Sequence, residues 1–163
     1  MARAAAHTRR WRIAELIFGL PFGASFVLHA IYPMGIAQGA FLPLLTPIGI
    51  VLILLAIGII GAARRELARY DQPTDPGQPT GRLVTTGPYS RSRNPLYLAA
   101  ALFFLGLALL LNTVWGVVAL LLAVVACRYL LIVPEERYLA AKFGADYGAY
   151  CASVGRWLGR RRP

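Results

Sequence analysis

Residues 87–97 read Gly-Pro-Tyr-Ser-Arg-Ser-Arg-Asn-Pro-Leu-Tyr, a polar, arginine-bearing segment that runs directly into an apolar stretch. A second charged cluster, Pro134-Glu135-Glu136-Arg137, follows the same apolar region. Between the two clusters, residues 95–133 form two apolar runs separated by the polar pair Asn112-Thr113. This pattern predicts a membrane hairpin whose two ends bring both clusters to one membrane surface. Such a placement suits a substrate with a polar head and an apolar tail.

The whole chain is rich in apolar residues. Of its 163 residues, 58% are hydrophobic and 15% are charged, whereas soluble domains carry about 25% charged residues. Apolar runs at 13–31, 41–62, 95–111 and 114–133 reach or approach the roughly 20 residues that cross a bilayer. We therefore predict an all-α integral membrane protein with about four transmembrane helices and a C-terminal interfacial helix.

This length and pattern favour a single domain over residues 1–163. Residues 1–62 hold the two N-terminal spans, and 63–94 form a loop whose first part continues the second helix out of the membrane. Residues 95–133 form the helical hairpin. The tail, 134–163, is expected to begin with a helix along the membrane surface or over the site.

The basic residues are distributed unevenly along the chain. The net charge is +10, and the Lys and Arg residues lie in the N-terminal arm, in the 63–94 loop and from Arg128 onward. The connections at 32–40 and 111–113 contain none. This positive-inside pattern places both termini and the 63–94 loop in the cytoplasm, with the chain in the inner, cytoplasmic membrane. It accounts for the charge without nucleic acid, which we exclude as a partner.

Two local patterns predict helix starts. Asn is a favoured N-cap and Pro is favoured at the first helical position, so Asn94-Pro95 predicts the start of the third span, with the Asn94 side chain as its cap. Pro134, followed by Glu135 and Glu136, predicts that a new helix begins after the fourth span and runs to about residue 157.

The sequence also resembles a known family. Residues 83–89 (LVTTGPY), residues 93–97 (RNPLY) and the pair Glu135-Glu136 resemble the isoprenylcysteine carboxyl methyltransferase family, whose wider group includes the phospholipid methyltransferases. The resemblance covers roughly residues 81–157. It implies an integral-membrane enzyme that transfers a methyl group from S-adenosylmethionine to a lipophilic acceptor, such as a prenylated substrate or a lipid head group.

One position departs from the family pattern. The family commonly has Arg-His-Pro where this chain has Arg93-Asn94-Pro95, and Asn94 does not titrate near neutral pH as histidine does. Methyl transfer to a carboxylate or thiolate needs no base, because that acceptor is already anionic. An amine or phenol acceptor would need a proton acceptor, and Glu135 or Glu136 is the candidate for that role.

The resemblance and the chemistry of the cofactor together single out candidate residues. The carboxylates of the acidic pair accept hydrogen bonds from amino and hydroxyl groups, and an arginine at a helix start pairs with a carboxylate. The aromatic residue one turn into the helix lies beside the arginine, and a glycine permits close backbone approach. We assign catalytic roles to Arg93, Glu135 and Glu136. The expected cofactor-binding residues are Gly87, Tyr89, Arg93, Asn94, Tyr97, Glu135 and Glu136.

Other interpretations stay open at this point. An NADPH-dependent reductase like the sterol reductases has a similar closing motif, although Tyr97 is followed here by Leu-Ala rather than Gly-Glu. A non-catalytic membrane subunit that binds anionic lipid or a partner protein also fits the basic loops. Cys127 and Cys151 lack metal-ligand spacing and are interpreted as packing residues, so we assign no metal site. Arg128, within the fourth span, either extends to the membrane surface or serves a site.

Overall fold

The computed structural model describes residues 14–73 and 80–159. Its described part is built from helices, and the predicted apolar runs are confirmed as helices. The elements, in chain order, are α1 (Ala14–Ile31), η1 (Gly39–Phe41), α2 (Leu42–Arg69), η2 (Gly87–Ser90), α3 (Pro95–Leu110), α4 (Val114–Cys127), η3 (Arg128–Ile132) and α5 (Val133–Ser153).

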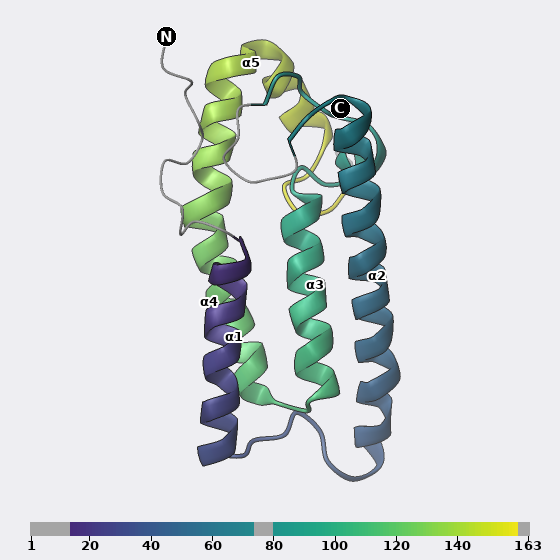
Figure 1. Cartoon of the computed structure of the whole chain (residues 1–163), viewed down its shortest axis with the longest axis vertical. Helices are drawn as coiled ribbons and strands as arrows, with labels where there is room; N and C mark the ends of the chain where they lie inside the picture. Colours follow the sequence, from purple (N-terminus) through teal and green to yellow (C-terminus); the bar gives the residue numbers. More distant parts are fainter. Residues whose placement is uncertain (1–13, 74–79, 160–163) are drawn as a thin grey trace.

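The long helices lie side by side in an up-and-down bundle (Figure 1). Helix α3 packs against α2 and α4, and α1 packs mainly against α4. The end of α2, the start of α3 and α5 lie together at one end, which we call the α5 end. The α1–α2 connection and the α3–α4 turn lie at the opposite end. The two motifs that flank the predicted hairpin are therefore at the same end of the molecule.

Two helical stretches are long and apolar enough to cross a membrane, Gly39–Arg69 and Val114–Ser153. Two further apolar helices, Leu16–Ile31 and Pro95–Leu110, are shorter. Large apolar side chains are exposed along the outer faces of α2 and α4, where lipid would cover them. These include Leu44, Val51, Leu54, Leu121, Leu122 and Val125.

The predicted helix start at Pro134 is confirmed to within one residue, since α5 begins at Val133 with Pro134 in its first turn, followed by Glu135 and Glu136. The helix of the fourth span does not end before it, because the helix that starts at Val114 runs on into α5. Between α4 and α5 it passes through a π-helical turn, Arg128–Ile132. The ring of a proline crowds the carbonyl four residues earlier, here that of Leu130. That carbonyl lies within the widened turn, which accommodates the proline without ending the helix.

The direction of the chain changes at Gly144 instead. Its backbone is non-helical, with a φ of 52°, a conformation that glycine adopts without steric cost. The following residues fold back over the α5 end, where Tyr147, Tyr150 and Val154 pack with Leu83. The tail helix ends at Ser153, a few residues before the predicted end.

A glycine contact brings α2 and α3 together. A Cβ added to Gly49 would lie 2.8 Å from the carbonyl oxygen of Gly106, and one added to Gly106 would lie 2.7 Å from that of Gly49. Both positions thus require the absence of a side chain. Small residues that allow such close backbone approach are typical of helix pairs in membranes.

Asn112 organises the opposite end of the bundle. Its backbone has a φ of 46°, and its side-chain oxygen accepts hydrogen bonds from the amides of Ile36 (2.8 Å) and Ala37 (3.0 Å). The side-chain amide donates to the carbonyl of Ala37 at 3.1 Å. The predicted Asn-Thr turn is confirmed, and the turn also anchors the α1–α2 connection.

We expect Gly49→Leu to destabilise the bundle by about 1–3 kcal/mol, the usual cost of overpacking. Gly58→Leu on the same helix is the matched control, because nothing lies within 4 Å of a Cβ built there. Unfolding in detergent, followed by circular dichroism, measures both variants. Equal stability of the two variants would contradict the assigned α2–α3 contact.

Candidate active site

The candidate site lies at the α5 end, where three separate segments meet. These are the 86–94 segment that leads into α3, the first turn of α5, and the residues after α5. Backbone hydrogen bonds join the first and last of them: the amide of Arg93 donates to the carbonyl of Gly155 at 3.1 Å, and that of Gly159 donates to Arg91 at 2.9 Å. The C-terminal segment is therefore part of the site.

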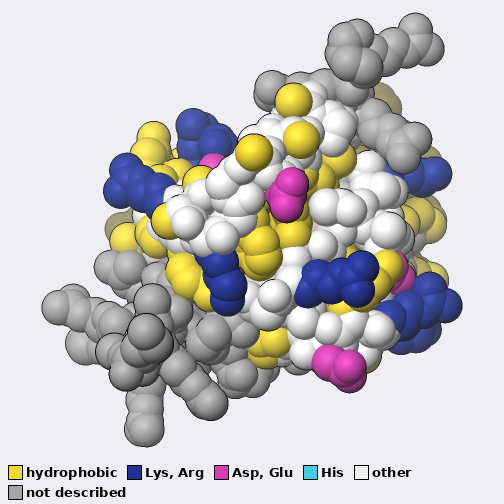
Figure 2. All heavy atoms as spheres, turned by 90° about the horizontal axis from the view of Figure 1, so that it is seen from above, with side chains coloured by type: hydrophobic (Ala, Val, Ile, Leu, Met, Phe, Trp, Pro, Cys, Tyr) yellow, Lys and Arg dark blue, Asp and Glu magenta, His cyan; other side chains and the backbone are white. Residues whose placement is uncertain are grey.

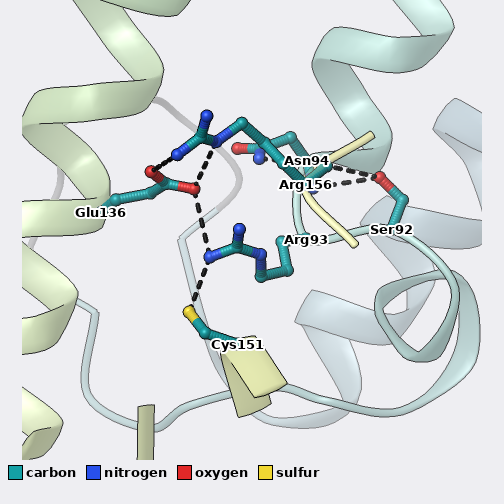
Figure 3. A network of polar contacts seen from close by, with 6 residues as sticks. All are labelled: Ser92, Arg93, Asn94, Glu136, Cys151 and Arg156. Atoms are coloured by element: carbon teal, nitrogen blue, oxygen red, sulfur yellow. Dashed lines mark hydrogen bonds and ion pairs between the residues drawn. The ribbon is translucent and has the colours of Figure 1, made fainter. Parts of the chain in front are cut away.

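Glu136 is held between two arginines (Figure 3). Arg156 donates from Nε and Nη2 to its two carboxylate oxygens, at 2.9 Å and 2.7 Å. Nη1 of Arg93 lies 3.2 Å from Oε1 of the same carboxylate. The hydrogen bonds that Arg156 donates to Glu136 raise the pKa of Arg156 above its ordinary value, so this guanidinium stays charged. We call Arg93, Glu136 and Arg156 the ion cluster.

Arg93 also faces the tail. Its Nη1 donates to Sγ of Cys151 at 2.6 Å, and only 11% of its side chain is exposed. Its Nε is buried and has no hydrogen-bond partner in the described structure. The prediction that Cys151 is only a packing residue therefore missed its contact with a site arginine. Cys127, in contrast, is fully buried in the apolar core, as predicted.

Glu135 contacts the motif at the start of α3. The hydroxyl of Tyr97 donates to its Oε2 at 3.1 Å. The ring of Tyr97 belongs to the buried core cluster, together with Cys127 and Leu131. The structure thus brings together Tyr97 and Glu135, which are 38 positions apart in the sequence. Their assignment to cofactor binding stays a prediction.

Asn94 occupies the N-cap position of α3, but the predicted side-chain cap is wrong, since its side chain forms no capping hydrogen bond. Its side-chain amide instead donates to the backbone carbonyl of Arg156 at 3.1 Å. Its own backbone amide donates to Oγ of Ser92 at 3.1 Å. The C-terminal segment competes for this side chain, and Asn94 fastens that segment to the start of α3. Pro95 lies in the first turn, as predicted.

The Gly87–Ser90 turn forms the corner of the site, and it depends on an acidic residue that sequence reasoning missed. Glu66, on the extension of α2, is 8% exposed and accepts a hydrogen bond from the Thr86 hydroxyl. Gly87 has a φ of 58°, and a Cβ there would lie 2.9 Å from Cδ of Glu66. The signal in the sequence is the seven-residue spacing of the small residues Gly49, Ala56 and Ala63, which marks the helix face that Glu66 shares.

Tyr89 is held in this corner by the tail, since the Tyr150 hydroxyl donates to its backbone carbonyl at 2.7 Å. Burial, and next the nearby charge of Glu135, raise the pKa of the Tyr89 phenol above its ordinary value. The phenol therefore stays protonated at neutral pH. It is available as a hydrogen-bond donor and not as a base.

Comparisons with known proteins identify the family of the chain. The sequence model of the phospholipid methyltransferase (PEMT) family matches residues 45–146, which is more than half of the chain. The chain belongs to the phospholipid methyltransferase family. It is 33% identical over 92 residues to the cobalt-zinc-cadmium resistance protein CzcN of Cupriavidus metallidurans. That alignment covers 56% of this chain and 43% of CzcN, so the chain spans less than half of that relative. No solved structure matches.

Membership of the phospholipid methyltransferase family indicates a membrane methyltransferase that uses S-adenosylmethionine. Together with the two long apolar helices, it indicates a membrane location. The wider group predicted from the motifs is confirmed. The narrower resemblance to isoprenylcysteine carboxyl methyltransferases stays a prediction.

The residues present fit this cofactor. S-adenosylmethionine carries a carboxylate, an amino group, ribose hydroxyls and a positively charged sulfur. The buried Nε of Arg93 lacks a partner in the described structure and is a donor suited to a carboxylate. The Glu135 carboxylate accepts a hydrogen bond from Tyr97, and a carboxylate can accept several. Glu135 therefore retains acceptor capacity for amino or hydroxyl groups.

Gly87→Ala is expected to destabilise the folded protein by about 1–3 kcal/mol, because it combines an unfavourable φ with a contact on Glu66. In a Glu66→Ala background the added Cβ no longer meets the Glu66 side chain. Gly87→Ala should therefore lower the free energy of unfolding by less in that background. Chemical unfolding of the two single variants and the double variant measures this coupling.

The control for the backbone substitution is Gly148→Ala, where nothing lies within 4 Å of an added Cβ. If Gly87→Ala and Gly148→Ala lowered the stability equally, the assigned contact between Gly87 and Glu66 would be contradicted. Purely additive losses in the double variant would mean that strain at Gly87 is independent of Glu66.

Proposed function

We propose that this protein transfers the methyl group of S-adenosylmethionine to a lipophilic acceptor that enters the α5 end laterally from the bilayer. The observation that carries the proposal is the placement of Arg93 and Glu135. Arg93 offers a buried Nε donor that has no partner within residues 14–73 and 80–159, and Glu135 offers a carboxylate with acceptor capacity. Both lie at the end of an apolar bundle.

In this proposal each charged residue has a separate task. Arg93 binds the carboxylate of the cofactor, and Glu135 binds its amino or hydroxyl groups while supplying negative charge near the sulfonium. Glu136 and Arg156 hold Arg93 in place through the ion cluster. Gly87 and Tyr89 shape the corner above α3. Holding two reactants in the correct geometry supplies a large part of the rate acceleration of many transfer reactions.

We propose an anionic acceptor, a carboxylate or thiolate on a lipophilic molecule such as an isoprenylcysteine. Asn94 replaces the titratable residue of the motif, and Tyr89 stays protonated at neutral pH. An acceptor that is already anionic requires no proton removal. A lipid amine or hydroxyl is the alternative, in which Glu135 or Glu136 also acts as base. Chemical identification of the methylated product would show which of the two acceptor classes is used.

We further propose that all four long helices cross the membrane and that the α5 end faces the cytoplasm. The 32–38 connection and the Asn112 turn contain no Lys or Arg. At the α5 end, Arg64, Arg65, Arg69 and Arg137 are exposed. Figure 2 shows basic side chains spread around this end, with apolar side chains between them. Such asymmetry is what the positive-inside rule requires.

The proposal predicts saturable binding of S-adenosylmethionine to the purified protein, competed by S-adenosylhomocysteine. Glu135→Gln, Glu136→Gln and Arg93→Ala should each weaken binding roughly ten- to hundredfold, because each loses a charge-assisted hydrogen bond. Calorimetry in detergent measures the affinities, and transfer of an isotope-labelled methyl group to lipid extracts measures the activity.

Asp146→Asn, at an exposed position of α5, is the matched control and should bind normally. Glu136→Gln should also lower thermal stability, because it weakens the ion cluster, whereas Glu135→Gln should change mainly the affinity. Normal binding of S-adenosylmethionine by all three site variants would contradict the assignment of these residues to the cofactor site. Binding of NADPH in place of S-adenosylmethionine would favour the reductase, and binding of neither would favour a non-catalytic subunit.

The orientation predicts opposite labelling of two single cysteines in oriented vesicles. Met34→Cys, exposed near the Asn112 end, should react only from outside, and Arg64→Cys only from the cytoplasmic side. The parent protein gives the background from its own cysteines, of which Cys127 is buried. Labelling of Met34→Cys from the cytoplasmic side would contradict the orientation.

A further inference from the structure

Arg128 lies on the outer face of its helix, among exposed apolar side chains. The inner face of this helix is buried and contains Leu120, Ala123, Cys127 and Leu131. The residues exposed on the outer face, at the spacing of successive helical turns, are Leu121, Leu122, Val125, Arg128 and Tyr129. Charged residues within membrane helices almost always face the bundle interior or a water-filled cavity. Arg128 does neither, so its charge needs an explanation outside the bundle.

No carboxylate of the described structure neutralises Arg128. The ion pairs within residues 14–73 and 80–159 join Arg69 to Glu66, and both Arg93 and Arg156 to Glu136. The guanidinium of Arg128 instead lies 5.6 Å from the centre of the Tyr129 ring. Tyr129 is itself 62% exposed. The pair thus presents a positive charge and an amphipathic ring on the same outer surface.

The depth of Arg128 follows from the length of the helix. The helix begins at Val114, next to the polar turn at Asn112, and Arg128 begins the π-helical turn. At about 1.5 Å per residue, its backbone lies roughly 21 Å from that start. The hydrocarbon core is about 30 Å thick, so a helix that starts at its boundary places the Arg128 backbone about 9 Å inside the core on the α5 side. A long arginine side chain extends from such a depth toward the head groups on that side.

We propose that Arg128 and Tyr129 form a binding site for the phosphate of an anionic phospholipid on the outer surface of the Val114–Ser153 helix. The site is separate from the ion cluster, because Arg128 is exposed and forms no ion pair with Glu136. An anionic lipid is the occupant because its net negative charge compensates an arginine that has no counter-ion among the described residues. A zwitterionic lipid carries its own positive charge and compensates less. The inference rests on the proposed membrane orientation, which the cysteine labelling tests independently.

A bound lipid here would fix the depth of the helix that carries Glu135 and Glu136. The proposed lipid site occupies the start of the π-helical turn, Arg128–Ile132, which directly precedes the helix that carries these carboxylates. Tyr129 adds a ring of the kind that favours the membrane interface. The lipid site therefore positions the candidate active site at the level of the head groups without contacting the cofactor.

The test is native mass spectrometry of the full-length, delipidated protein in detergent, titrated with phosphatidylglycerol or with phosphatidylcholine. The wild-type protein should retain phosphatidylglycerol more tightly than phosphatidylcholine. Arg128→Gln should lower the affinity for phosphatidylglycerol about fivefold, the effect of one basic residue near an anionic surface. Arg128→Lys keeps the charge and should retain most of that affinity.

Arg137→Gln is the matched control, since Arg137 is exposed on the same continuous helix but lies beyond the acidic pair. It should bind phosphatidylglycerol as the wild-type protein does. Equal losses in Arg128→Gln and Arg137→Gln would mean that the basic surface attracts lipid without a site, and would overturn the proposal. Equal affinity of the wild-type protein for the two lipids would overturn it as well, and that measurement needs no variant.

Discussion

The ion cluster is the interaction on which the candidate site depends. A single carboxylate, Glu136, joins the segment before α3, through Arg93, to the segment after α5, through Arg156. The Glu136 side chain is 16% exposed, so its attraction to the two guanidiniums is screened less than that of a surface pair. Two positive charges share one negative charge. This excess fits a site that receives a carboxylate.

The bundle places the other parts of the site around this cluster. Because Gly49 and Gly106 let α2 and α3 approach closely, the extension of α2 carries Glu66 to the Gly87 corner. The uninterrupted helix through Pro134 carries Glu135 to Tyr97. The molecule is thus divided into apolar outer faces and a polar α5 end. The proposed methyl transfer, between a water-soluble donor and a lipophilic acceptor, would use both.

Sequence reasoning succeeded where one local pattern controls the outcome. Apolar runs predicted the helices, and Asn112-Thr113 predicted the turn between α3 and α4. It failed at the Asn94 cap, where a local preference competes with a tertiary contact. The Asn94 amide donates to the backbone carbonyl of Arg156, which lies 62 positions away in the sequence. The π-helical turn that joins α4 to α5 was also not predicted.

The sequence by itself determined the helical, apolar architecture, the membrane methyltransferase family and the choice of Arg93, Glu135 and Glu136 as candidate residues. These follow from hydrophobic periodicity and from motifs within short stretches. Only the tertiary structure decided that Glu136 pairs with Arg93 and Arg156, that Glu66 supports Gly87 and that Arg128 faces outward. Hydrogen bonds and ion pairs act over a few ångströms in space. Their partners are therefore set by how the helices pack and where Gly144 turns the chain.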